Sequence, residues 1–254
     1  MSTPASQPAV AMSSGAATLW LADVRDSLAT NVSNYADCLA FLTPDERRRY
    51  AGFIRAQRQL EFLASRLLLR LAISRHLQIA TAAIEVSVEA DAAPHLRVNG
   101  STTDVPFFSL SHSNGIVACA VSQTQALGLD IETHNPRHDP LAISRATFSP
   151  AEHAWLLAQN EADRTAAFYQ LWNSKEALYK LQCILQRQPS ALPEMTGPDG
   201  KLLTAGPPCF VFPRPRPDIF VAICSMQALS CVTCLPLFSF RSDRDGNDIG
   251  RFFS

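Results

Sequence analysis

The clearest indication of the fold lies in residues 107–132, which read FFSLSHSNGIVACAVSQTQALGLDIE. Two apolar runs, 107–111 and 116–122, are joined through Asn114-Gly115, a dipeptide that strongly favours a tight β-hairpin turn. A third run, 126–132, follows after a short polar stretch. These residues therefore predict three consecutive strands in the middle of the chain.

Helical stretches lie on both sides of these strands, and each begins with a capping box. The boxes read Thr43-Pro-Asp-Glu46 and Ser149-Pro-Ala-Glu152, with Pro at the first helical position of each. We expect the first stretch to run to about Leu77, with a break near Gly52.

The two capping boxes lie 106 residues apart, which suggests an internal repeat. The same offset pairs Arg58 with Arg164 and Phe62 with Phe168. A repeat would build two similar halves about a pseudo-twofold axis, and ligands favour the seam between such halves. The alternative is that these few matches coincide by chance.

Four further strands are expected, at residues 18–24, 210–212, 219–224 and 229–234. The fold class predicted is α+β, with pseudo-twofold duplicated halves, each of helices packed on a largely antiparallel sheet. The expected divisions are a flexible tail at 1–17, an N-terminal half at 18–124, a C-terminal half at 125–240 and a loose tail at 241–254.

The composition limits the classes of partner. The chain has 22 basic and 23 acidic residues among 254, a net charge of −1, which argues against a nucleic-acid binder. No window resembles a transmembrane helix, and residues 1–17 lack the basic and apolar regions of a signal peptide. We therefore expect no nucleic-acid partner and no membrane partner, and a duplicated chain can close its own site as a monomer.

Seven cysteines, an odd number, sit mostly in apolar runs, as reduced core thiols do. Cys231 and Cys234 have metal-like spacing, but no second such pair or nearby histidine completes a site. We favour a core strand over a metal site here. Reduced thiols indicate the cytoplasm.

Two carboxylates end the third central strand. Because side chains alternate along a strand, Asp130 and Glu132 point to the same face, roughly 6–7 Å apart. Carboxylates on one face repel each other unless a cation or solvent separates them. The pair is therefore either a cation site or a solvated strand end.

The second helical stretch adds a third carboxylate. Trp172, Glu176 and Lys180 are spaced by four residues and share one helical face. The bulky aromatic residue indicates that this face is covered, although an exposed ion pair is the alternative. Asp130, Glu132 and Glu176 together form an all-oxygen ligand set that suits Mg²⁺.

Histidine and arginine residues offer contacts to phosphate. His112 ends a strand between Ser111 and Ser113, and no nucleophile elbow accompanies them, which argues against a serine hydrolase. Four arginines of the first helical stretch fall within about a third of its circumference, which suits phosphate groups or an acidic protein. They are Arg55, Arg58, Arg66 and Arg70. A surface histidine and a solvated basic helix face are the alternatives.

These motifs, in this order, resemble the larger, Sfp-type group of phosphopantetheinyl transferases. The family's Gly-x-Asp-x-Glu is present as Gly128-Leu-Asp130-Ile-Glu132, and its Trp-x-x-Lys-Glu-x-x-x-Lys as residues 172–180. Its Ser-His-Ser is present as residues 111–113, and Phe148-Ser149 with Glu152 matches the connecting segment. The resemblance spans roughly residues 43–180, more than half of the chain.

The resemblance implies a function and a role for each matching residue. The family transfers the 4'-phosphopantetheine arm of coenzyme A to a serine of an acidic apo carrier protein and releases adenosine 3',5'-bisphosphate. Asp130, Glu132 and Glu176 would hold Mg²⁺ on the coenzyme A pyrophosphate, and Glu176 and Lys180 would be catalytic. The expected coenzyme A contacts are Arg49, Arg58, Ser111, His112, Lys175 and Lys180.

The sequence departs from the family in three places. Ala92-Ala93 precede Pro94 where relatives often carry Gly-Lys, Cys183 and Leu185 replace a Gly-x-Gly turn, and Glu46 stands where a basic residue is expected. Two other functions stay open. One is a non-catalytic module that binds coenzyme A or a carrier protein, and the other is a Mg²⁺-dependent nucleotide phosphohydrolase.

Overall fold

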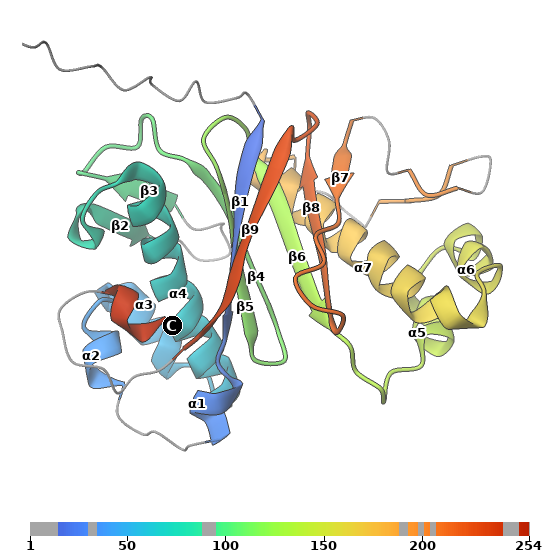
Figure 1. The fold of residues 1–254 in the computed structure, drawn as a ribbon, viewed down its shortest axis with the longest axis horizontal. Coiled ribbons are helices and arrows are strands. Elements are labelled where there is room, and N and C mark those ends of the chain that lie inside the picture. The colour runs from blue at the N-terminus through green and yellow to red at the C-terminus, as the bar shows by residue number, and fades with distance from the viewer. Residues whose placement is uncertain are drawn as a thin grey trace, which may run out of the picture.

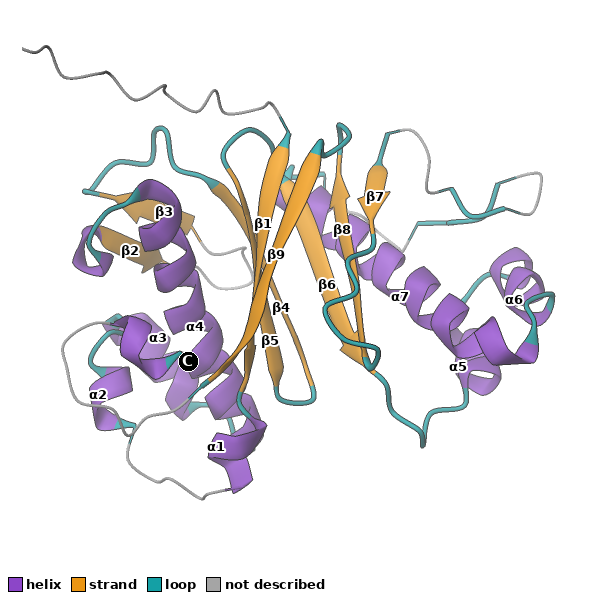
Figure 2. Ribbon diagram, in the orientation of Figure 1, coloured by secondary structure: helices purple, strands orange, loops and turns teal. Residues whose placement is uncertain are grey.

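The computed structural model describes residues 15–29, 35–87, 95–187, 193–197, 201–203, 207–240 and 249–253. Two β-sheets lie side by side in the middle of the molecule, and a long helix covers the outer side of each, α4 on one side and α7 on the other (Figures 1 and 2). This mixed architecture confirms the predicted α+β class. No helix among the described residues has the length and apolar character needed to cross a membrane.

The first sheet has the strand order β4-β5-β1-β9. Its strands are β1 (Ala16–Asp23), β4 (Phe107–Ser113), β5 (Ile116–Ser122) and β9 (Cys231–Ser239). The predicted hairpin is confirmed, since β4 and β5 pair antiparallel around Asn114 and Gly115, which have φ angles of 45° and 80°. The pairing of β1 with β5 is also antiparallel, whereas β1 and β9 run parallel.

The second sheet has the order β6-β8-β7 and is antiparallel throughout. Its strands are β6 (Leu127–Thr133), β7 (Cys209–Val211) and β8 (Ile219–Ser225). A separate small hairpin pairs β2 (Ile84–Ser87) with β3 (His95–Val98). All of the strands predicted from the sequence are therefore present, with ends shifted by one or two residues, except that β9 runs to Ser239 instead of residue 234.

The helices follow the predicted capping boxes. They are α1 (Arg25–Ala29), α2 (Ala36–Leu39), α3 (Pro44–Ala51), α4 (Ala56–Leu77), α5 (Pro140–Thr147), α6 (Pro150–Leu157) and α7 (Glu161–Ile184), with the 3-10 helices η1 (Thr81–Ala83) and η2 (Ile249–Phe252). The side chains of Thr43 and Ser149 cap α3 and α6 as expected. The break near Gly52 is also present, between α3 and α4.

The chain repeats one topology. In the first half, β1 is followed by α3, α4, β4 and β5, which pair in the order β4-β5-β1; in the second, β6 is followed by α6, α7, β7 and β8, which pair in the order β7-β8-β6. This agreement supports the predicted duplication.

The two halves also share a buried ion pair. Glu46, at the third position of α3, accepts hydrogen bonds from Arg70 of α4, and Glu152, at the third position of α6, accepts from Lys175 of α7. The two glutamates are 106 residues apart, whereas the two basic residues are 105 apart. Equivalent residues of the two halves are thus 106 positions apart at the capping boxes and 105 positions apart in the middle of the long helices.

The hydrophobic core forms three layers. Alternate residues of β1, β5, β6 and β8, among them Leu19, Ala118, Leu129 and Val221, fill the space between the two sheets. The opposite face of the first sheet packs against α4, and that of the second sheet against α7. The even-numbered residues of β6 consequently face α7, so Asp130 and Glu132 lie on the helix side of the sheet.

Two predicted boundaries are wrong. The last strand, β9, pairs with β1 in the first sheet, so the segment 125–240 is not one self-contained half. Ile249, Phe252 and Phe253 are buried in the core layer between the first sheet and α4, so these residues are not a loose tail. Their apolar side chains outweigh the polar composition around them, because burial of each stabilises the fold. Residues 1–14 and 241–248 lie outside the described residues.

The interpretation of Cys231 and Cys234 as core residues is also wrong. Both lie on β9 as predicted, but both are exposed, because β9 is the edge strand of its sheet. None of the seven cysteines forms a disulfide bond, and Cys38, Cys119 and Cys224 are the buried ones.

Gly128 sets the distance between β6 and α7. A Cβ atom added to it would lie 1.9 Å from the Ala177 carbonyl oxygen and 2.8 Å from the Leu181 backbone nitrogen. No side chain fits in this space, so the strand contacts the helix backbone directly. This contact brings the α7 face that carries Glu176 and Lys180 against the carboxylates of β6.

We expect Gly128→Ala to lower the free energy of unfolding by about 1–3 kcal/mol or more, because the new methyl group must displace the α7 backbone. Chemical denaturation measures this loss. Gly52→Ala is the matched control: its Cβ would meet atoms at 3.5 and 3.6 Å, which is ordinary contact, and its stability should stay close to that of the native protein. Equal stability of the two variants would contradict the close approach.

Candidate active site

The two sheets meet along β4 and β6, each of which is an edge strand of its own sheet. Three buried serines of β4 span this seam with their hydroxyl oxygens. Ser109 accepts from the Leu129 N–H at 3.0 Å, Ser111 from the Ile131 N–H at 3.3 Å and Ser113 from the Thr133 N–H at 3.3 Å. This serine ladder satisfies backbone donors of β6 that have no strand partner on that side.

Asp130 lies at the centre of the seam and is only 5% exposed. Its Oδ1 accepts from the Ser111 hydroxyl at 2.9 Å and from the Lys180 ammonium at 2.7 Å. Its Oδ2 is buried and has no hydrogen-bond partner among the described residues. A buried carboxylate oxygen without a donor is costly, so this atom is suited to accept a ligand.

Glu132 and Glu176 flank Asp130. The Ser113 hydroxyl donates to Glu132 Oε2 at 2.6 Å. Burial raises the pKa of Glu132 to about 7, against the lowering effect of Ser113, and the nearby Asp130 and Glu176 raise it further. Burial, followed by the charge of Asp130, also raises the pKa of Glu176. The three carboxylates therefore repel one another, as expected of a site that binds a cation.

Lys180 supplies positive charge to this cluster. Besides Asp130, its ammonium donates to the Ser111 hydroxyl at 2.9 Å and to the Leu129 carbonyl at 3.0 Å. The side chain is 29% exposed, so it reaches the cluster from the solvent side. The predicted meeting of Asp130, Glu176 and Lys180 on neighbouring faces of β6 and α7 is thus present in the structure.

His112 and Arg58 lie beside the seam and contact each other. Arg58 Nη1 is 3.0 Å from His112 Nδ1, and burial, followed by the charge of Arg58, lowers the pKa of His112 to about 4. The histidine is consequently neutral at pH 7 and accepts from the guanidinium. Both side chains are 37% exposed, which leaves them accessible to a ligand.

Glu61, which was not predicted from the sequence, orders this pair. It is buried, its Oε2 lies 3.2 Å from Arg58 Nη1 and 3.4 Å from His112 Nδ1, and its Oε1 accepts from the Gly115 N–H at 2.8 Å. One carboxylate thereby ties α4 both to the hairpin turn at Gly115 and to His112 of β4. The signal in the sequence was a single acidic residue within the otherwise apolar run 60–64.

Lys175 does not lie in the carboxylate cluster, contrary to our expectation of a phosphate contact. Its ammonium is buried and donates to Glu152 Oε1 and Oε2 at 2.6 and 2.8 Å and to the Pro193 carbonyl at 2.6 Å. These three acceptors use all three donors of the ammonium. Lys175 therefore serves the fold in this structure.

The predicted arginine face of the first helical stretch divides in two. Arg66 and Arg70 are buried against Glu46, which is 1% exposed, whereas Arg55 is exposed and Arg58 is half-buried. Glu46, which departs from the family pattern, thus caps α3 and pairs with α4.

Arg49, the expected contact of the adenosine 3'-phosphate, is exposed on α3. Its guanidinium forms no hydrogen bond with another described residue, so it is available to a ligand. Its role stays a prediction.

The cluster fits a magnesium ion without forming a complete protein cage. Within the described ranges, no group of three or more His, Cys, Asp or Glu side chains is arranged to hold a metal ion by itself. Mg²⁺ usually takes only one or two protein carboxylates and completes its shell with water and substrate phosphates. The unpartnered Asp130 Oδ2 and the raised pKa values of Glu132 and Glu176 agree with such an open site.

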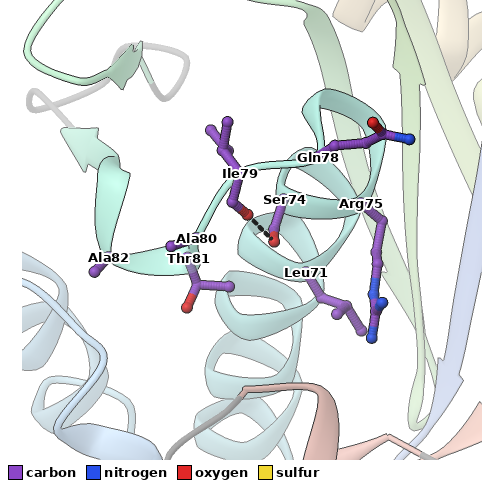
Figure 3. A pocket seen from close by; sticks show the side chains of 8 residues that line it. All are labelled: Leu71, Ser74, Arg75, Gln78, Ile79, Ala80, Thr81 and Ala82. Atoms are coloured by element: carbon purple, nitrogen blue, oxygen red, sulfur yellow. Dashed lines mark hydrogen bonds between the residues drawn. The ribbon is translucent and has the colours of Figure 1, made fainter. Parts of the chain in front are cut away.

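A cavity of about 660 Å³ lies elsewhere, where α4 ends and η1 follows (Figure 3). It is lined by Leu71, Ser74, Arg75, Gln78, Ile79, Ala80, Thr81 and Ala82. Figure 3 shows the Ser74 hydroxyl bonded to the Ile79 carbonyl, at 2.5 Å, so this polar group is already satisfied. No predicted site residue lines the cavity, and the candidate active site is therefore the seam.

Two family models match adjoining parts of the chain. The N-terminal model of 4'-phosphopantetheinyl transferases matches residues 29–124, and that of the 4'-phosphopantetheinyl transferase superfamily matches residues 126–201. The chain belongs to the 4'-phosphopantetheinyl transferase superfamily. The matched superfamily region contains all three carboxylates and Lys180, and the N-terminal region contains Arg58 and the serine ladder.

Three curated members of the superfamily illustrate the similarity. The transferase HetI of Nostoc sp. is 28% identical over 148 residues, 58% of this chain and 62% of HetI. Sfp of Bacillus subtilis is 31% identical over 144 residues, 56% of this chain and 60% of Sfp, and AcpT of Salmonella typhimurium is 32% identical over 130 residues, 51% and 58%. The chain spans about 60% of the length of these relatives.

We expect the stability of the metal-free protein to depend on pH through Glu132. Because folding raises its pKa from 4.5 to about 7, the folded state binds the proton more tightly, and stability is lost as the pH rises between these values. The loss is up to roughly 3 kcal/mol by pH 8. Denaturation in a chelating buffer from pH 5 to 8 measures it.

In that series, Glu132→Gln should remove most of the dependence, whereas Asp163→Asn, an exposed substitution on α7, should leave it unchanged. Parallel curves for the native protein and Glu132→Gln would contradict the assignment.

We expect Lys175→Met to lower the free energy of unfolding by about 3–5 kcal/mol, because it leaves the buried Glu152 carboxylate unpaired. Adding Glu152→Gln should recover part of this loss. Arg48→Met, which removes an exposed ion pair with Asp45 on α3, should cost no more than about 1 kcal/mol. A stable Lys175→Met protein with weakened coenzyme A binding would instead favour the original phosphate prediction.

Proposed function

We propose that this protein transfers the 4'-phosphopantetheine group of coenzyme A to a serine of an apo carrier protein and releases adenosine 3',5'-bisphosphate. Membership of the superfamily supports the proposal, as do the names of HetI, Sfp and AcpT, all 4'-phosphopantetheinyl transferases. The observation that carries it is the contact of Lys180 with Asp130 beside Glu132 and Glu176. This arrangement combines a cation site with a phosphate-binding ammonium.

The reaction needs positioning and charge neutralisation more than covalent help. Asp130, Glu132 and Glu176 would hold Mg²⁺, which would supply positive charge beside the pyrophosphate of coenzyme A. Lys180 exchanges part of its contact with Asp130 for a phosphate oxygen and stabilises the charge that develops there. The serine hydroxyl of the carrier attacks the β-phosphorus, the bond to the leaving phosphate of adenosine 3',5'-bisphosphate breaks, and Glu176 accepts the hydroxyl proton.

Residues beside the seam bind the rest of coenzyme A. Arg58 and His112 donate to phosphate oxygens, since a neutral histidine retains one N–H donor and Arg58 has further donors. Arg49 contacts the adenosine 3'-phosphate. Lys175 is omitted from this set, because its three donors already have acceptors.

The carrier protein is the macromolecular partner. Arg48 and Arg55 are exposed on and near α3, so an acidic carrier surface is favoured over a basic one. The repeated halves contribute both sides of the seam, which agrees with a monomer. Seven cysteines without a disulfide bond agree with the reducing cytoplasm as the place of action.

We expect coenzyme A, Mg²⁺ and an apo carrier protein, incubated with this protein, to yield a carrier heavier by one phosphopantetheine group. Intact mass spectrometry reads the product. Asp130→Asn and Glu176→Gln should each lower kcat/KM by about 10²-fold or more while remaining folded, since each loses a charge that the reaction requires. Lys180→Met should lower kcat more than it weakens coenzyme A binding.

Glu161→Gln, an exposed change at the start of the same helix, is the matched control and should retain activity. Binding of coenzyme A without transfer would favour a non-catalytic module. Release of phosphate from a nucleotide without any carrier would favour a phosphohydrolase. Full activity in chelator-treated protein without added metal would contradict the magnesium site.

A further inference from the structure

The serine ladder joins two sheets whose strands are not paired with each other by backbone hydrogen bonds. Ser109, Ser111 and Ser113 alternate along β4, and each hydroxyl oxygen accepts from the N–H of the β6 residue 20 positions later in the chain. The accepted N–H groups belong to Leu129, Ile131 and Thr133. All three serines are therefore equivalent as backbone acceptors.

The hydroxyl protons distinguish the three serines. A hydroxyl that accepts from a backbone N–H still has one proton to donate, and the fixed N–H limits the directions in which that proton can point. Ser111 donates to Asp130 Oδ1 at 2.9 Å and Ser113 to Glu132 Oε2 at 2.6 Å, in each case the side chain 19 positions later. The corresponding position for Ser109 is Gly128, which has no side chain.

The two carboxylates need such donors. Asp130 and Glu132 lie on one face of β6 beside Glu176, and their mutual repulsion favours rotamers that turn the charges apart. A hydroxyl donor from a rigid strand holds one oxygen of each carboxylate and leaves the second oxygen for a ligand. In Asp130 this second oxygen, Oδ2, is the buried atom without a partner among the described residues.

We propose that Ser111 and Ser113 are positioning residues that orient Asp130 and Glu132 for a divalent cation, whereas Ser109 closes the seam without affecting the cation. The proposal rests on the proposed function, because that function makes the two carboxylates ligands of Mg²⁺. It gives Ser111 a different role from the phosphate contact that the family resemblance implies, since the Ser111 proton is already committed to Asp130.

The chain itself provides the matched control. Ser109→Ala, Ser111→Ala and Ser113→Ala each remove the acceptor of one β6 N–H, so their melting temperatures should fall by similar amounts. Binding of Mn²⁺ to the metal-free protein, followed by the electron paramagnetic resonance signal of free Mn²⁺, reports the cation site without substrate or turnover. Ser111→Ala and Ser113→Ala should weaken Mn²⁺ binding about 10–100-fold, and Ser109→Ala should leave it unchanged.

Two further measurements separate positioning from general damage. Ser113→Thr retains the hydroxyl and should bind Mn²⁺ like the native protein. In the transfer assay, Ser111→Ala and Ser113→Ala should raise the Mg²⁺ concentration for half-maximal rate while the KM for carrier protein stays unchanged. If an alanine variant does not fold, Ser111→Cys and Ser113→Cys keep the side-chain volume with a weak donor and should show the same loss of Mn²⁺ binding.

Equal weakening of Mn²⁺ binding by Ser109→Ala would overturn the proposal, because the ladder would then act only through the fold. Native-like Mn²⁺ binding by Ser111→Ala and Ser113→Ala would overturn it as well, as would a native protein that binds no Mn²⁺. The expected Mn²⁺ pattern in a native protein without transfer activity would support the positioning role and refute the proposed function, so the two failures are distinguishable.

Discussion

The direct contact of β6 with the α7 backbone at Gly128 is the constraint on which the rest of the site depends. A strand and a helix normally keep a layer of side chains between them, but here one glycine removes that layer. Glu176 and Lys180 therefore lie against Asp130 and Glu132 instead of a side chain's length away. Burial and like charge then follow from the geometry, and they raise the pKa values of the two glutamates.

The grouping of acidic and basic residues in the site could be predicted where the residues lie on the same strand or the same helix. Alternation along β6 predicts the shared face of Asp130 and Glu132, and spacing by four predicts that of Glu176 and Lys180. The partners of Lys175 and Glu46 could not be predicted, because each ion pair joins two helices and its burial depends on their packing. Likewise, β9 was assigned to the wrong sheet because its neighbour β1 lies more than 200 residues earlier.

The duplicated framework uses the same ion pair for stability in both halves and different residues for chemistry. In each half, a glutamate of the capping box is buried against a basic residue of the long helix. Next to Lys175 the second half carries Glu176, whereas next to Arg70 the first half carries the buried Leu71. The carboxylates of the site thus come from the second half, and Arg58, His112 and the serine ladder come from the first, so neither half has a complete site.

The position of β9 has a consequence for the order in which the protein is made. Synthesis proceeds from the N-terminus, so β1, β4 and β5 leave the ribosome long before residues 231–239, and the buried Ile249 and Phe252 emerge later still. Until then, one edge of β1 and part of the core against α4 remain uncovered. Exposed strand edges and apolar surface are prone to aggregation, and long-range pairing is slow to form. The first half therefore exposes a strand edge and apolar surface during translation, and its sheet and core are completed only once residues 231–253 have emerged.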